Sequence, residues 1–179
     1  MTIKVFLTNG SDFTICEACV TKGKRESTVS LLAEGEPFLC DFCEQLNVVF
    51  EGTQPEKKLD SAGWDLRAQD DASIPVGKVQ IIGTGLRLAM PKGWEAQIRA
   101  RSSYGAKGVI VANGPGTIDH NYRDEVGVIL LNLSGSVFEI KHGDRIAQML
   151  FAPVPDVVWS RGSLNETDRK GGFGSTGVQ

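Results

Sequence analysis

The stretch Gly116-Thr117-Ile118-Asp119-His120-Asn121-Tyr122-Arg123 places one carboxylate and one aromatic ring three residues apart. Glycine and proline precede it at 114–116, and an apolar run follows it at 126–133. Turn residues beside an apolar run predict a tight β-hairpin, so Asp119 and Tyr122 are expected on the same loop. Because a lone acid in a hairpin is usually only a turn former, the rest of the sequence decides whether Asp119 has a function.

Short apolar runs separated by turn residues continue outward from this hairpin in both directions, with hardly any helical periodicity. Ser134-Gly135-Ser136 predicts a further hairpin, and only residues 102–107 predict a helix. Many short strands at near-regular spacing are typical of a β-sandwich or jelly roll. Strands are predicted at 48–50, 74–76, 79–82, 86–90, 96–99, 108–112, 126–133, 137–140 and 145–151.

All four cysteines lie in the first quarter of the chain, as two C-x-x-C pairs about twenty residues apart: Cys16, Cys19, Cys40 and Cys43. Two thiolates separated by two residues can bend around one cation, and a second pair completes a tetrahedron. This spacing favours a structural zinc site over a redox pair or unligated buried cysteines. Residues 1–44 hold four Lys or Arg against seven Asp or Glu, which argues against a DNA-binding finger.

The whole chain of 179 residues has a formal net charge of −3, with no basic character of the kind that nucleic-acid binding requires. No apolar run approaches the roughly 20 residues of a membrane span, and no signal peptide is evident. The sequence therefore predicts a cytoplasmic protein with no nucleic-acid or membrane partner. Its length accommodates one domain and a small module.

Four further strings accompany the hairpin in a fixed order, and each is weak evidence by itself. They are Ala62-Gly63-Trp64-Asp65-Leu66-Arg67-Ala68, Arg101-Ser102-Ser103, Gly143-Asp144-Arg145-Ile146-Ala147-Gln148 and Gly171-Gly172-Phe173-Gly174-Ser175-Thr176-Gly177. Together with the hairpin they resemble the five ordered motifs of the trimeric dUTP pyrophosphatases (dUTPases). The resemblance covers residues 46–179 and implies a jelly-roll-like β-barrel or sandwich at 45–179, preceded by a zinc-ribbon-like module at 1–44.

Members of this family hydrolyse dUTP to dUMP and pyrophosphate, which limits uracil in DNA and supplies dUMP for thymidylate synthesis. The resemblance implies a homotrimer with sites between subunits, and magnesium held mainly by the substrate triphosphate. Asp119 is expected to activate the attacking water, and Tyr122 to lie against the deoxyribose. The edge of the uracil base is expected to be recognised by Asn113, Gly116, Thr117 and Ile118. The phosphates are expected to be bound by Arg101, Ser102, Ser103 and Gln148.

The C-terminal residues 165–179 are expected to form an arm that closes over the site of another subunit. Phe173 is expected to stack on uracil, and Arg169 is expected to reach the terminal phosphate. Further amide and hydroxyl hydrogen-bond donors are expected from Gly174, Ser175 and Thr176. The family often has four residues between its arginine and the aromatic, whereas this chain has three. Lys170 is therefore an alternative to Arg169. Asn121 and Asp124 also depart from the usual pattern, at positions with no expected catalytic role.

Structural roles compete with functional ones at several of these positions. Arg101-Ser102-Ser103 taken alone favours a simple helix cap, and Asp65 with Arg67 can form a structural pair across a subunit interface. Asp144 and Arg145 favour a structural role, and the three tryptophans Trp64, Trp94 and Trp159 favour core or interface packing.

The chain has no Walker-type loop, so it is not a P-loop enzyme. Two rival functions remain. A dCTP deaminase-like enzyme of the same fold would carry a glutamate in the strand after the hairpin, and residues 126–133 contain no acid. A nucleotide-sensing regulatory module, with a protein partner bound to the cysteine module, is the other alternative; an intact Asp119 and tail argue against a purely non-catalytic role.

Overall fold

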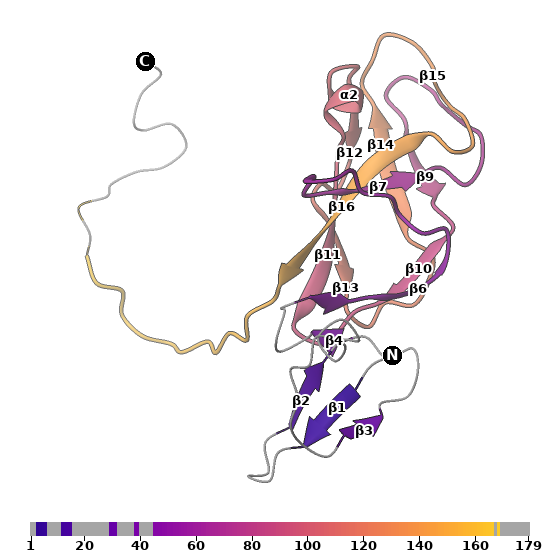
Figure 1. Cartoon of the computed structure of the whole chain (residues 1–179). Helices are drawn as coiled ribbons and strands as arrows, with labels where there is room; N and C mark the ends of the chain where they lie inside the picture. The colour runs from indigo at the N-terminus through magenta and orange to yellow at the C-terminus, as the bar shows by residue number, and fades with distance from the viewer. Residues whose placement is uncertain are drawn as a thin grey trace.

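In the computed structural model of the chain, side chains are described for residues 45–166 and Asp168, and backbone alone for residues 3–6, 12–15, 29–31 and 38–39. The body is built almost wholly from β-strands (Figure 1). They are β1 Ile3–Phe6, β2 Asp12–Ile15, β3 Val29–Leu31, β4 Phe38–Leu39, β5 Leu46–Asn47, β6 Val49–Gly52, β7 Trp64–Arg67, β8 Ala72–Ile74, β9 Val79–Gly83, β10 Leu86–Ala89, β11 Trp94–Arg99, β12 Val109–Val111, β13 Gly116–Asp119, β14 Gly127–Asn132, β15 Phe138–Ile140 and β16 Arg145–Pro153. The helix α2 spans Ser102–Gly105.

Every strand pairing is antiparallel. A four-stranded sheet in the order β13-β11-β16-β7 and a three-stranded sheet in the order β12-β14-β9 lie within residues 45–166. Both contribute side chains to one hydrophobic core, with Ile98 and Met149 from the first sheet and Val109, Val128 and Leu130 from the second. The predicted mainly β fold is therefore confirmed, because two sheets bury their inner faces against each other.

The outer face of β12-β14-β9 is aliphatic as well. Along β14, Val128, Leu130 and Asn132 point inward, and the residues between them point out. Ile129 lies opposite Ile81, and Leu131 lies opposite both Val79 and Ile110. Val79 is 55% exposed and Ile81 67% exposed. We call these five outward residues of β9, β12 and β14 the aliphatic face; within the described residues it is open to solvent.

The hairpin predicted at 134–136 is wrong. β14 pairs with β12 and β9, whereas β15 pairs with β8, so the two segments that flank the turn do not pair with each other. The cause is Asn132, which is fully buried. Its amide nitrogen donates to Ile74 O at 2.8 Å and Ser136 O at 2.9 Å, and its oxygen accepts from the N–H and hydroxyl of Ser134. These bonds turn the chain away from β14 and toward β8.

The predicted helix is shorter than expected, because α2 ends at Gly105 and residues 106–108 continue as turns. Gly108 has φ +78, a left-handed conformation that favours glycine at the end of a helical turn. Among the described residues, no helix is long and apolar enough to cross a membrane. Strand β7 was not predicted, because its run Trp-Asp-Leu-Arg contains two charges in four residues.

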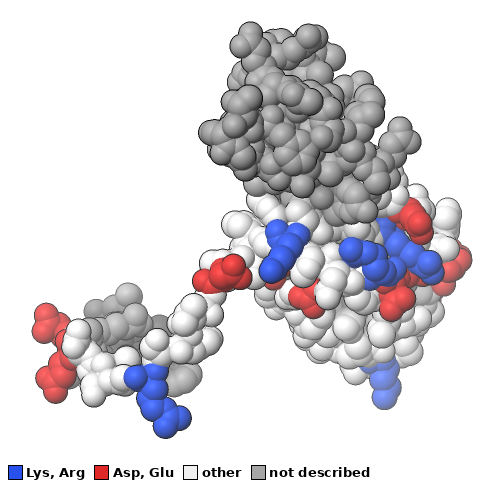
Figure 2. Space-filling view, turned by 90° about the horizontal axis from the view of Figure 1, so that it is seen from below, with Lys and Arg blue, Asp and Glu red and all other residues white. Residues whose placement is uncertain are grey.

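Beyond Pro153 the chain leaves the body as an extended segment (Figure 1). Trp159 is 93% exposed there, so it does not fill the core of its own chain. Trp64 and Trp94 pack against the core, as predicted. Lys, Arg, Asp and Glu side chains are interspersed on the face of the body seen in Figure 2, which presents no field of a single sign.

Candidate active site

The turn before β16 fixes where that strand begins. Asp144 accepts a hydrogen bond from Lys141 N at 2.9 Å through its carboxylate, and its carbonyl accepts from Ala68 N at 2.8 Å. Gly143 has φ +82, and its carbonyl accepts from Arg67 Nη1 at 2.8 Å. The structural role predicted for Asp144 agrees with these contacts. They join the start of β16 to β7, so residues on the two strands face each other in a fixed register.

Asp65 on β7 lies at the centre of a charged cluster. It is 8% exposed, and its carboxylate oxygens lie 3.0 Å from Arg145 Nη1 and 3.4 Å from Arg101 Nε. Gln148 Nε2 donates to the same carboxylate at 3.4 Å. Arg67 is not its partner in this chain, since Arg67 pairs with Glu56 at 2.8 Å. A buried carboxylate with two guanidinium partners is stable only when all three groups are held together.

Arg101 and the serines that follow it belong to the start of α2. Arg101 is extended, makes no side-chain cap bond, and instead donates to Arg145 O at 2.7 Å. Ser102 and Ser103 occupy the first turn and are exposed. Tyr104 N and Gly105 N both donate to Arg101 O at 3.0 Å, so the N–H groups of Ser102 and Ser103 are the ones that this turn can offer beside two exposed hydroxyls. The simple cap that Arg101-Ser102-Ser103 favours in isolation is therefore not formed by side chains.

Tyr104 anchors α2 to the body. It is 8% exposed, and its ring lies edge-on to Phe138 with centroids 5.0 Å apart. Burial raises the pKa of the Tyr104 hydroxyl above its ordinary value, and the negative charge of Asp144 raises that pKa further. The hydroxyl therefore stays protonated at neutral pH and cannot act there as a base.

Gln148 projects from β16 beside the cluster, opposite Asp65 on one side and Arg99 on the other. Gly63 leaves room for its side chain, because a Cβ at Gly63 would lie 3.2 Å from Gln148 Cβ and 3.4 Å from Cδ. A larger residue at 63 would push the carboxamide away from Asp65. Close packing against Gln148 therefore explains why residue 63 in the first motif is a glycine.

The tight β-hairpin predicted around Asp119 is wrong as a strand pairing, because β13 pairs with β11, whereas β14 pairs with β12 and β9. Residues 116–123 are instead strand β13 followed by a turn, for which we keep the name hairpin. Asp119 lies exposed at the end of β13. The turn that follows is closed by a hydrogen bond from Tyr122 N to Asp119 O at 3.1 Å. Tyr122 is 38% exposed and donates from its hydroxyl to Glu125 O at 3.0 Å. Arg123 Nη1 donates to His120 O at 2.8 Å and to Tyr122 O at 2.9 Å. Acid and ring are therefore brought onto one braced loop, as predicted.

Asn113 lies across from the start of β13. A Cβ at Gly116 would lie 3.0 Å from Asn113 Nδ2 and 3.4 Å from its Oδ1, so only glycine lets the carboxamide rest against the strand. The peptide bond between Gly114 and Pro115 is cis. Thr117 is exposed and Ile118 half-buried. The backbone of β13 and one carboxamide thus form a polar edge at this end of the hairpin.

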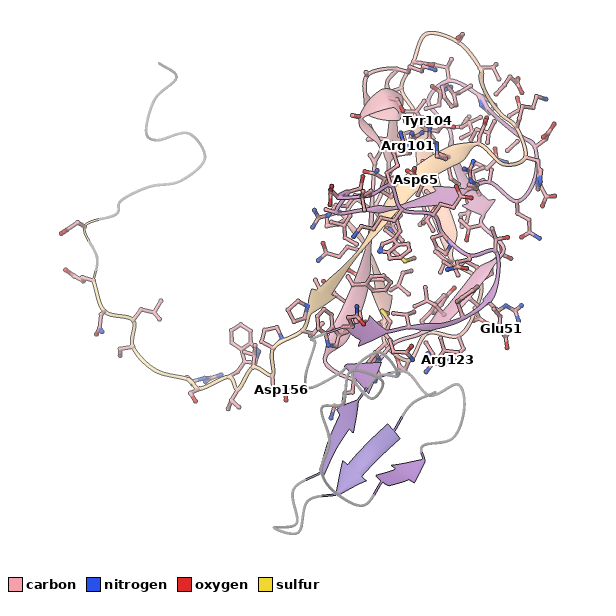
Figure 3. All side chains as sticks on the ribbon, viewed as in Figure 1. Glu51, Asp65, Arg101, Tyr104, Arg123 and Asp156 are labelled. Carbon is pink, nitrogen blue, oxygen red and sulfur yellow. The ribbon has the colours of Figure 1, made fainter. Side chains whose placement is uncertain are left out.

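The two groups of predicted site residues lie apart within one chain. Asp119 is opposite Glu95 on one side of β11, and Gln148 is opposite Arg99 on the other side. Four residues along a strand and two strand spacings across give a separation of roughly 16 Å between the two backbones. In Figure 3, Asp65, Arg101 and Tyr104 gather at one end of the body, and Arg123 of the hairpin lies well away from them.

A cavity of about 630 Å³ lies elsewhere in the described residues. It is lined largely by apolar side chains, among them Leu46, Phe50, Trp64, Trp94 and Phe151. None of the residues that the sequence assigns to the substrate site lines it. A largely apolar lining offers little to a triphosphate, so this cavity is separate from the candidate site.

Several predicted site residues lie outside the described residues. They are Cys16, Cys19, Cys40 and Cys43 of the amino-terminal module, and Arg169, Phe173, Gly174, Ser175 and Thr176 of the tail.

Comparison with known families identifies the fold and the motifs together. The dUTPase family model matches residues 53–177, which includes all five motifs. This chain belongs to the dUTPase family. A deoxyuridine 5'-triphosphate nucleotidohydrolase of Rickettsia prowazekii is 50% identical over 135 residues, covering 72% of this chain and 91% of the relative. A Wolbachia pipientis enzyme of the same name is 48% identical over 126 residues, covering 66% of this chain and 82% of the relative.

Among solved structures, the native dUTPase of EIAV superposes with a TM-score of 0.60 at 28% identity. The match covers 67% of this chain and 99% of the EIAV chain. The body described above is therefore a dUTPase fold, and the strands that hold Asp65, Arg101, Gln148 and the hairpin are its framework.

The sequence did not single out three of the residues that hold the candidate site in place. Glu56 pairs with Arg67. Arg123 holds the turn after β13, and the carbonyl of Glu125 accepts the Tyr122 hydroxyl. Arg123 stands in the quoted hairpin string, where its position beside Tyr122 was the available signal. Nothing in the sequence pattern marks Glu56, because its partner Arg67 is eleven residues away.

The Asp65 cluster predicts a contrast between two carboxylates. Asp65→Ala would leave two partly buried guanidinium groups without their anion, and we expect the free energy of unfolding to fall by about 3 kcal/mol or more. Glu56→Ala removes the partner of Arg67, but the Glu56 side chain is 71% exposed; there we expect a loss below about 1 kcal/mol. Urea unfolding at one fixed protein concentration measures both. Equal losses would contradict the central role assigned to Asp65.

Proposed function

We propose that this chain hydrolyses dUTP to dUMP and pyrophosphate by attack of water on the α-phosphate. The observation that carries the proposal is the 50% identity to a named deoxyuridine 5'-triphosphate nucleotidohydrolase over 91% of that relative's length. Such an enzyme limits the uracil incorporated into DNA and supplies dUMP for thymidylate synthesis. The deaminase alternative is not favoured, since β14 carries no acid.

Asp119 is the proposed catalytic residue. Its exposed carboxylate orients the water and takes its proton as the bond to the α-phosphorus forms. The bond between the α-phosphorus and the bridging oxygen breaks, and pyrophosphate leaves. His120 shares the turn, but its carbonyl rather than its ring is tied to Arg123.

The phosphate end of the proposed site consists of Arg101, Ser102, Ser103 and Gln148. Two guanidinium groups and a carboxamide gathered around Asp65, beside free N–H donors and exposed hydroxyls, form a site that stabilises charge on phosphate oxygens. Asp65 keeps these donors in place, because it neutralises part of their charge and fixes their directions.

The hairpin end of the proposed site recognises the nucleoside. Asn113 and the backbone of Gly116, Thr117 and Ile118 bind the uracil edge, and their closeness excludes the methyl group of thymine. The Tyr122 ring lies against the deoxyribose and leaves no room for a 2′-hydroxyl. The support for this assignment is the polar edge that Asn113 and β13 form beside a braced tyrosine.

The active enzyme is a homotrimer in this proposal, with each site shared between chains. A carboxylate must lie within hydrogen-bond reach of the water it activates, and one chain leaves its acid roughly 16 Å from its own Gln148. The aliphatic face is a surface that a neighbouring copy can cover, since so large an apolar patch is unusual on a monomer. A second chain would bring its hairpin to the phosphate end of the first.

The tail completes the site from another subunit. Residues 165–179 form a closing arm, in which Phe173 stacks on uracil, Arg169 or Lys170 reaches the terminal phosphate, and Gly174, Ser175 and Thr176 donate to phosphate oxygens. The extended course of residues 154–166, which leads away from the body, supports an arm that reaches a neighbour (Figure 1).

Magnesium accompanies the triphosphate. Within residues 45–166 and Asp168, no group of three or more His, Cys, Asp or Glu residues is placed to hold a metal, so the phosphate oxygens are the proposed ligands. Bound magnesium neutralises negative charge on the phosphates. The protein's own contribution is the donor set around Asp65 and the acid on the hairpin.

The amino-terminal residues 1–44 form a separate module that holds one structural zinc. Cys16 directly follows β2, and Cys40 directly follows β4 in the sequence. β2 lies against β4, which supports the approach of the two cysteine pairs. Four thiolates close a tetrahedral shell and leave no position for catalysis. A protein partner of this module stays a prediction.

The catalytic role of Asp119 predicts the effect of a near-isosteric change. Asp119→Asn keeps the shape but removes the base, so we expect kcat for dUTP to fall roughly 10²-fold or more while nucleotide affinity is largely retained. Pyrophosphate release measures the first quantity, and calorimetry with a non-hydrolysable dUTP analogue the second. Asp124→Asn, an exposed acid of the same loop, is the matched control. Near-normal turnover by Asp119→Asn would overturn the mechanism.

Shared sites predict that two inactive variants rescue each other. Asp119→Asn damages only the hairpin end, and Ser102→Ala only the phosphate end. In trimers formed from equal amounts of both, roughly a quarter of the sites combine an intact hairpin with an intact phosphate end. Co-refolding followed by the pyrophosphate assay should therefore recover about a quarter of wild-type activity. No recovery in trimers shown to be mixed would mean that each chain carries its own complete site.

The zinc module predicts one zinc per chain and independence from catalysis. A chelator should loosen residues 1–44, because so small a module depends on its metal for stability, yet dUTP hydrolysis should persist. Elemental analysis of protein purified under reducing conditions checks the first part, and the absence of bound metal would refute it. Lost hydrolysis in a Cys16→Ser variant that still forms the intact oligomer would show that the module is coupled to the active site.

A further inference from the structure

The two ends of Tyr122, its backbone and its hydroxyl, are each held by a hydrogen bond. Its backbone N–H donates to Asp119 O at 3.1 Å, and its hydroxyl donates to Glu125 O at 3.0 Å. The side chain is 38% exposed, so packing alone holds only part of it. The place where the hydroxyl end of the ring lies therefore depends on the position of the Glu125 carbonyl.

The Glu125 carboxylate is bound to a different part of the fold. Its Oε1 accepts a hydrogen bond from Gly85 N at 2.8 Å, in the turn that joins β9 to β10. The turn fits closely around it, because a Cβ at Gly83 would lie 2.6 Å from Glu125 Oε1. Gly85 has φ +66, which favours glycine at the residue that donates. Glu125 thus connects the hairpin of Tyr122 to the β9–β10 turn.

The residue after Glu125 is tied to the same turn at both of its backbone groups. Val126 N donates to Leu86 O at 2.8 Å, and Val126 O accepts from the Thr84 hydroxyl at 2.6 Å. Thr84 is 2% exposed and Val126 is fully buried. With Gly85 N on Glu125 Oε1, three bonds hold residues 125–126 on residues 84–86. The carbonyl that accepts the Tyr122 hydroxyl is therefore on a fixed support.

We propose that Glu125 is a positioning residue for sugar selectivity. Its carboxylate, held by Gly85 N, helps to fix the backbone carbonyl that accepts the Tyr122 hydroxyl, and so keeps the ring in the position that excludes a 2′-hydroxyl. This inference rests on the proposed function, in which Tyr122 lies against the deoxyribose. Glu125 itself touches neither substrate nor water in this role.

The effect falls on selectivity more than on the rate with dUTP. Asp119 is held by the pairing of β13 with β11, which does not involve Glu125. When the bond between Gly85 N and the Glu125 carboxylate is lost, the Tyr122 ring can move aside and admit a ribose, whereas Asp119 stays where it was. A site that rejects by contact loses its discrimination when the contacting group is displaced by as little as about 1 Å.

The test compares kcat/KM for dUTP and for UTP in four forms of the full chain. Glu125→Ala removes the acceptor for Gly85 N, and we expect the ratio of dUTP to UTP to fall about tenfold. Glu125→Gln keeps an oxygen in place, and we expect its ratio to stay within about twofold of wild type. Tyr122→Phe removes the hydroxyl, and we expect a fall similar to that of Glu125→Ala.

The double variant Tyr122→Phe/Glu125→Ala decides whether the two residues act through one contact. Its ratio should be no lower than that of either single variant, because the second change removes a support that the first has already disconnected. An unchanged ratio in Glu125→Ala, with both substrates slowed equally, overturns the proposal in favour of a general loss of folded enzyme. Independent, multiplying effects in the double variant overturn it as well, and so does lost selectivity in Glu125→Gln.

A readout without catalysis separates this proposal from the proposed function. The chain has two tyrosines, Tyr104 and Tyr122, so 3-fluorotyrosine labelling gives two fluorine resonances, assigned with Tyr122→Phe. Glu125→Ala should move the Tyr122 resonance and leave that of Tyr104 unchanged, and Glu125→Gln should move neither. A stationary Tyr122 resonance in Glu125→Ala overturns the support role. Wild-type protein that does not hydrolyse dUTP overturns the proposed function instead, whatever the resonances do.

Discussion

The structure depends on one buried carboxylate, Asp65, held between two guanidinium groups. Taking three charges out of water is costly unless each finds its partners, so Arg101 and Arg145 have little freedom to move independently. Through them β7, β16 and the segment that leads into α2 are joined at one point. The exposed serines and the Gln148 carboxamide are then presented from a frame whose geometry is already determined.

Strand β11 sets the distance between the two functional ends. It pairs with β13 on one side and with β16 on the other, so Asp119 and the proposed phosphate-binding residue Gln148 are fixed to the same strand at different positions. Antiparallel pairing does not stretch or slide, because a one-residue slip would turn every inward side chain outward. No rotation of side chains brings the two ends together within one chain, and that rigidity is why a second copy enters the proposed site.

The sequence predicted those parts of the fold and site that depend on local patterns. Alternating and apolar runs gave most strands, and the turn residues gave the loop that carries Asp119 and Tyr122, although its flanking strands pair elsewhere. The parts that failed depend on contacts between distant residues. Asn132 sends the chain to β8 through bonds to Ile74 and Ser136, which no periodicity encodes. Asp65 finds its partners within the chain at residues 36 and 80 positions later, and no local pattern marks them.

The support of Tyr122 was missed for the same reason. Glu125 follows the hairpin string by only two residues, and its partner Gly85 is forty residues earlier. The sequence of a polar loop does not indicate that its glutamate has so distant a partner. Likewise, the glycines at 83 and 85 predict only a turn. The positions proposed to touch substrate were recognisable from the family's motifs, whereas the residues that support them were not.

The aliphatic face has a consequence for the life of the protein before assembly. A newly made chain exposes aliphatic side chains on a three-stranded sheet, which is the kind of surface that also promotes aggregation. In the proposed homotrimer, association is at least second order in chain concentration, so dilution would prolong the time for which that surface stays uncovered. Synthesis of several chains close together in time and space would then protect the protein from aggregation.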